Sequence, residues 1–70
     1  MARQKLPFTI LIEEIDKVRG VKLPKKYHKR IKNHLANSIV HRSIFERGDY
    51  DALAKILRNY ISLWIREDNV

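Results

Sequence analysis

Apolar residues recur at three- and four-residue steps along most of this chain, in three segments separated by glycine and proline. The first segment covers residues 7–19 and precedes Gly20, which suits the left-handed position that closes a helix. Its apolar positions are Phe8, Leu11, Ile12, Ile15 and Val18. No stretch shows the period-two alternation of a strand, so the pattern predicts an all-α protein.

The second periodic segment covers residues 24–46, beginning at Pro24, a residue tolerated in a first helical turn. Its main apolar stripe is Tyr27, Ile31, Leu35 and Ile39, and a second row is Ala36, Val40 and Ile44. On a straight helix the second row would lie roughly opposite Ile31. Either the helix bends or divides near Asn37 and Ser38, or its last turns are buried on several sides.

The third segment covers residues 50–67, with Asp49 as the expected N-cap. Its apolar residues are Leu53, Ile56, Leu57, Tyr60, Ile61, Leu63, Trp64 and Ile65. They cover more than half of the helix circumference, which needs two neighbouring helices, or one helix and a second protein. We therefore predict one domain over residues 1–70, a small three-helix bundle that has four helices if its middle helix divides.

Length and composition limit what such a domain can do. With 70 residues and no cysteine, the chain is expected to form one small core without a disulfide or a deep active-site cleft. The apolar stretch Phe8–Ile12 is too short for a signal peptide or a membrane-spanning helix. We expect a cytoplasmic protein, with association with the nucleoid as one option, and no membrane partner.

Positive charge is concentrated in the middle of the chain. Residues 17–45 contain nine lysines and arginines and no acidic residue, whereas the stretches before and after each carry a net charge of −1. Like charges four residues apart on a helix cost a few tenths of a kcal/mol each (roughly 0.2–0.5), and surface helices usually relieve this with glutamate. The lack of any such relief indicates a surface that meets a polyanion.

Nucleic acid, either DNA or RNA, is the partner that this pattern favours. The expected binding residues are Lys22, Lys25, Lys26, Lys29, Arg30, Lys32 and Asn33. Because lysine dominates the set, we expect contacts mainly with the phosphate backbone. The aromatic residues do not interleave with the basic ones, because Tyr27 lies on the apolar stripe and Tyr60 and Trp64 lie on the apolar face of the third segment. Stacking on unpaired bases is therefore not indicated. A solvated lysine-rich helix, an acidic protein surface and an anionic membrane are the alternatives.

A second functional hypothesis concerns the wide apolar face of the third segment. Apolar residues at the margins of the stripes would form an interface if they remain exposed. The candidate residues are Val40, Ile44, Tyr60, Leu63, Trp64 and Ile65. In this alternative the protein is an accessory subunit of a larger component of replication, transcription or translation, or it forms a homodimer.

Catalytic and metal-binding patterns are weak. The chain has no cysteine nucleophile and no glycine-rich phosphate loop, so we predict no enzymatic activity and no cofactor. Histidines at positions 28, 34 and 41 are the only candidate metal ligands with a shared pattern. Positions 34 and 41 would lie about 10.5 Å apart along a straight helix, too far to share an ion, so we predict no metal site.

Overall fold

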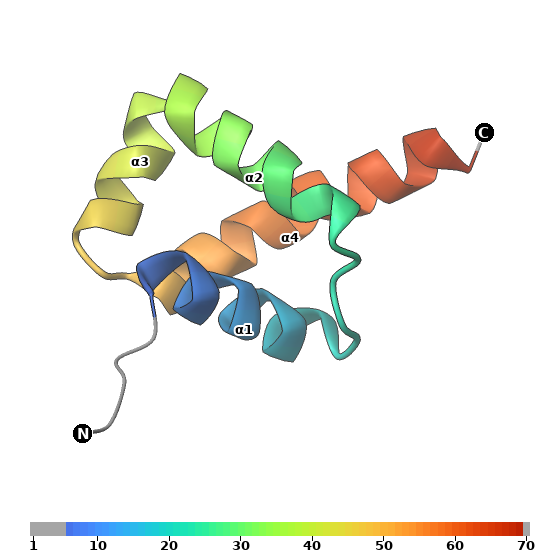
Figure 1. The fold of residues 1–70 in the computed structure, drawn as a ribbon, viewed down its shortest axis with the longest axis horizontal. Coiled ribbons are helices and arrows are strands. Elements are labelled where there is room, and N and C mark those ends of the chain that lie inside the picture. Colours follow the sequence, from blue (N-terminus) through green and yellow to red (C-terminus); the bar gives the residue numbers. More distant parts are fainter. Residues whose placement is uncertain (1–5, 70) are drawn as a thin grey trace.

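The computed structural model describes residues 6–69, and within this range it contains four α-helices and no strand. The helices are α1 (Pro7–Arg19), α2 (Lys26–Asn37), α3 (Ile39–Glu46) and α4 (Tyr50–Asp68). The all-α class is confirmed, and the middle segment takes the divided form (Figure 1).

Ser38 separates α2 from α3. Its backbone is extended, with φ −117° and ψ 105°, so it closes α2 and begins α3. The Ser38 amide donates to the carbonyl of His34, and the Ser38 hydroxyl oxygen accepts a long bond of 3.4 Å from the His41 amide. Asn and Ser side chains compete for backbone hydrogen bonds, which explains why the helix divides at the Asn37-Ser38 pair.

Other helix boundaries follow local chemistry. Gly20 and Gly48 have φ values of 78° and 82°, the left-handed geometry that glycine adopts at little cost. α2 begins at Lys26 rather than Pro24. Pro24 and Lys25 instead form a tight turn, in which their carbonyls accept hydrogen bonds from the backbone amides three residues later. Asp49 lies at the N-cap of α4, but its side chain makes no capping bond and lies 3.7 Å from the Arg47 Nε atom.

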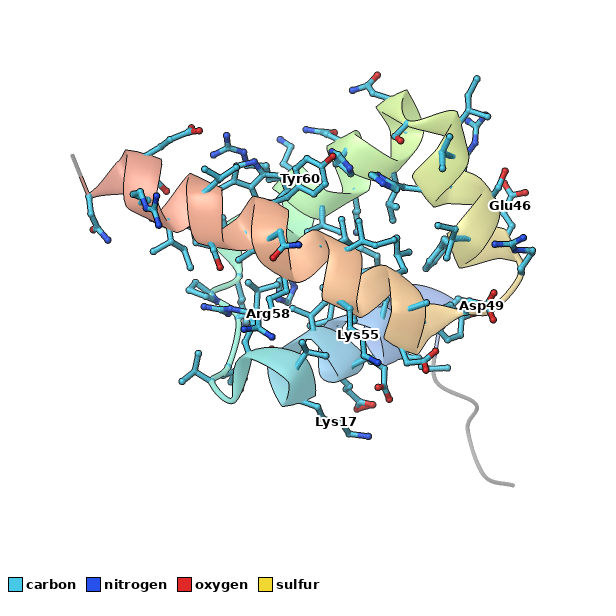
Figure 2. All side chains as sticks on the ribbon, turned by 180° about the vertical axis from the view of Figure 1, so that it is seen from behind. Lys17, Glu46, Asp49, Lys55, Arg58 and Tyr60 are labelled. Carbon is cyan, nitrogen blue, oxygen red and sulfur yellow. The ribbon has the colours of Figure 1, made fainter. Side chains whose placement is uncertain are left out.

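The helices form a short zigzag. α1 and α4 run in the same direction, α2 returns in the opposite direction, and α3 crosses one end of the molecule (Figure 1). The most extensive packing is between α1 and α4. Seen from behind, α4 lies in front of α2 (Figure 2), and the two helices contact each other through Tyr27, Arg30 and Trp64. α4 extends past α1, and its last turns lie beside the start of α2.

One apolar core joins α1, α2 and α4. Its buried side chains are Leu11, Ile12, Ile15, Leu23, Tyr27, Ile31, Leu35, Leu53, Ala54, Leu57, Ile61 and Trp64. α3 contributes no fully buried residue and only packs Ile44 and Phe45 against the margin. Ile39, expected in the stripe of the middle segment, is 72% exposed because the break at Ser38 ends that stripe at Leu35. None of the helices in the described range is long and apolar enough to cross a membrane.

Candidate functional site

The six predicted basic residues lie on α2 or just before it, and all of them are exposed. Lys25, Lys29 and Lys32 follow one another at steps of four and three residues, so they lie along one line of the helix surface. We call these three residues the lysine row. None of them forms an ion pair within residues 6–69. The row is therefore an uncompensated cationic strip.

The other edge of α2 is covered by the acidic C-terminal end of α4. Asp68 Oδ2 lies 3.4 Å from Lys26 Nζ, and Glu67 Oε2 lies 3.6 Å from Arg30 Nη2. Both pairs are substantially exposed, so solvent screening leaves them little effect on stability. Their main consequence is electrostatic, because two of the six predicted cations already have carboxylate partners.

Asp68 is also fixed by a core residue. The Tyr27 hydroxyl donates a 2.5 Å hydrogen bond to Asp68 Oδ2. This bond favours the carboxylate, so it lowers the pKa of Asp68 and raises the pKa of Tyr27. The charge opposite Lys26 therefore persists at neutral pH.

Arg30 is held by an aromatic ring as well as by Glu67. Its guanidinium carbon lies 4.7 Å from the centre of the Trp64 ring, within the range of a cation–π contact. The buried Trp64 ring in turn stacks beside Tyr27, with centroids 6.5 Å apart. Arg30 is thus attached to α4 on two sides and is less available to a ligand than the lysine row.

Two further cations from the acid-free stretch also have partners. Lys17 Nζ lies 3.3 Å from Glu14, and Arg42 Nε lies 3.9 Å from Glu46. The acidic residues missing from positions 17–45 are therefore supplied by residues just outside this stretch and by the end of α4. Lys22 precedes α2 in the connecting loop, is exposed and has no ion pair among the described residues. Asn33 is exposed on α2.

His34 and His41 lie much closer together than a straight helix predicts. His34 Nε2 and His41 Nδ1 lie only 2.7 Å apart, because the break at Ser38 turns α3 back toward α2. The bond requires one ring to donate its N–H and the other to accept it. Both rings also contact Tyr60, at centroid distances of 4.6 and 5.7 Å. Within residues 6–69, no cluster of three or more His, Cys, Asp or Glu side chains could hold a metal ion.

The lowered pKa of His34 predicts that the stability of the fold depends on pH. Partial burial, and secondarily the charge of His41, lower the pKa of His34. As the pH falls, the unfolded chain therefore binds a proton at His34 before the folded protein does. Stability should decrease as the pH falls from about 7 through 6.5 toward the lower pKa of His34 in the folded state.

Thermal melts between about pH 7 and pH 5 test this expectation. The wild-type Tm should fall over this range, and the His34→Gln variant should give a flatter profile. His28→Gln, on the edge of α2 that meets Phe8, is the matched control. A His34→Gln profile as steep as that of the wild type would contradict the assignment.

The apolar residues proposed as an interface divide between surface and core. Val40 and Leu63 are 69% and 50% exposed, and Tyr60 is at the margin with 37%. Trp64, in contrast, is 8% exposed and belongs to the core, while Ile44 and Ile65 are half-buried. Tyr60 and Leu63, together with Ile56 and Asn59, line a shallow depression of about 350 Å³ that does not include Val40.

Two parts of the site could not be anticipated from local sequence. The pairs that join Lys26 to Asp68 and Arg30 to Glu67 connect residues far apart in the chain, and no periodicity predicts them.

Comparisons of the chain with protein-family models, curated proteins and solved structures found no match.

Proposed function

We propose that this small helical bundle is a non-enzymatic nucleic-acid-binding protein that contacts the phosphate backbone through α2. The observation that carries the proposal is the lysine row, three exposed ammonium groups in line and without carboxylate partners in the described range. Phosphates are the anions that occur in a regular line, and lysine contacts them as a point charge. Because the proposed partner is nucleic acid, we also propose a cytoplasmic location.

Salt dependence tests this proposal directly. Four exposed lysines of α2 and its preceding loop, Lys22, Lys25, Lys29 and Lys32, have no ion pair within the described range. Four phosphate contacts on a duplex predict a log–log slope of about −3.6, which is a loss of roughly 10²-fold between about 50 and 200 mM salt. Six contacts, which require Glu67 and Asp68 to release Arg30 and Lys26, predict about −5.4. The measurement is fluorescence anisotropy with labelled DNA and RNA, and a slope near zero would refute the proposal.

A second candidate function uses the exposed apolar residues of α3 and α4. Ile39 and Val40 project from the start of α3, and the Tyr60 ring contacts the adjacent His41. In this candidate the protein is an accessory subunit that docks on a larger component of replication, transcription or translation, or it pairs with a second copy. Sedimentation analysis separates the two candidates, because a strictly monomeric protein without a co-purifying partner would count against this one.

A further inference from the structure

A groove between α2 and α3 brings aromatic and cationic side chains together. Its volume is about 460 Å³, and it is shallow and open to solvent. The apolar part of its lining is Phe8, Leu35, Ala36 and Phe45, and the charged part is Lys32, Arg42 and Glu46. We call it the α2–α3 groove.

The groove brings two phenylalanines close to basic residues, although the tyrosines and the tryptophan were expected on apolar faces. Lys32 Nζ lies 4.9 Å from the centre of the Phe8 ring, although the two residues are 24 positions apart in the chain. Arg42 and Phe45 are three residues apart on α3, so they share one side of that helix. The one acidic residue in the lining, Glu46, is 3.9 Å from Arg42 and compensates part of its charge.

Lys32 belongs both to the lysine row and to the α2–α3 groove. A chain of phosphates that follows Lys25 and Lys29 therefore reaches the groove at Lys32. We propose that the groove receives an unpaired base of a single-stranded nucleic acid, with Lys32 and Arg42 contacting the phosphates on either side of it. This inference rests on the proposed function, and it names the form of nucleic acid that the site selects.

An unpaired base fits this lining for two reasons. Its ring surfaces are apolar and stack on aromatic side chains, here Phe45, because Lys32 Nζ already lies over the Phe8 ring. The bases of a duplex present only their edges. The phosphates on either side of the base carry negative charge and would contact Lys32 and Arg42 of the groove lining. The lining offers little hydrogen-bonding capacity besides its charged groups, so binding is independent of base identity.

The test compares ligands that differ only in their bases. The probes are a labelled oligothymidylate, an abasic sugar-phosphate chain of the same length, and the oligothymidylate in a duplex; an oligouridylate tests RNA. The oligothymidylate should bind about tenfold more tightly than the abasic chain, which is the ordinary effect of stacking one base. Phe45→Leu should remove this preference and leave the affinity for the abasic chain unchanged.

A second variant fills the groove without removing a packed side chain. Ala36 is exposed on α2 and lines the groove, so Ala36→Leu should abolish the preference while the circular dichroism spectrum stays the same. Ala52→Leu makes the same change at an exposed position of α4 and should keep the preference. Equal binding of the thymidylate and abasic chains would overturn the groove assignment and leave phosphate binding intact. Loss of all salt-sensitive binding would instead refute the proposed function.

Discussion

Replacement of Lys25, Lys29 and Lys32 by glutamate should weaken nucleic-acid binding by more than about 10²-fold at moderate salt. The variant loses three phosphate contacts and places three carboxylates where the phosphates would approach. The fold should persist, because all three side chains are exposed and the repulsion between positions 25 and 29 is of similar size with two carboxylates as with two ammonium groups. Anisotropy titrations measure the affinity, and circular dichroism verifies the fold.

A control with the same net charge distinguishes a local contact from a general electrostatic effect. The control residues are exposed and lie on α1 and α4, namely Lys17, Lys55 and Arg58. Figure 2 labels them in the view in which α4 lies in front of α2. Their replacement by glutamate changes the total charge equally and should lower the affinity by less than about tenfold. If both triple variants lose affinity to the same extent, the lysine row is not the binding surface.

Truncation of Leu57 to alanine should produce the largest loss of stability. Leu57 is completely buried at the centre of α4, and such truncations cost about 2–5 kcal/mol. A domain of this length has a total stability of roughly 4–10 kcal/mol, so the variant should be largely or wholly destabilised. Urea denaturation followed by Trp64 fluorescence measures the change, because this single tryptophan lies in the same core.

Leu63→Ala provides the matched control for Leu57→Ala. It makes the same truncation on the same helix at a side chain that is 50% exposed, and it should cost less than about 1 kcal/mol. Comparable losses at the two positions would show that Leu63 is covered in solution. In that case the apolar α3 and α4 residues would be an interface, as the second candidate function requires.

Much of the fold follows from apolar periodicity. The bounds of α1 were predicted without error, and the break in the middle segment was one of two expected outcomes because its two apolar rows are incompatible with one straight helix. Ile39 was placed wrongly. Its spacing of four from Leu35 continues a stripe only if the helix continues, and Ser38 interrupts that geometry.

The site was less predictable than the fold, because it depends on contacts between distant segments. The exposed lysines of α2 follow from their positions opposite the Tyr27, Ile31 and Leu35 stripe. The proximity of His34 and His41 does not, since it depends on the angle between α2 and α3. Neither does the position of Phe8 beneath Lys32, which depends on how α1 packs against the rest of the molecule.

The lack of buried residues in α3 gives the two walls of the α2–α3 groove unequal stiffness. α2 is anchored by Tyr27, Ile31 and Leu35, whereas α3 is connected through one extended residue and only packs against the edge of the core. Elements with little burial are displaced at low free-energy cost. We therefore expect α3 to shift more readily than α2 when the groove is occupied, within the range that the hydrogen bond between His34 and His41 allows.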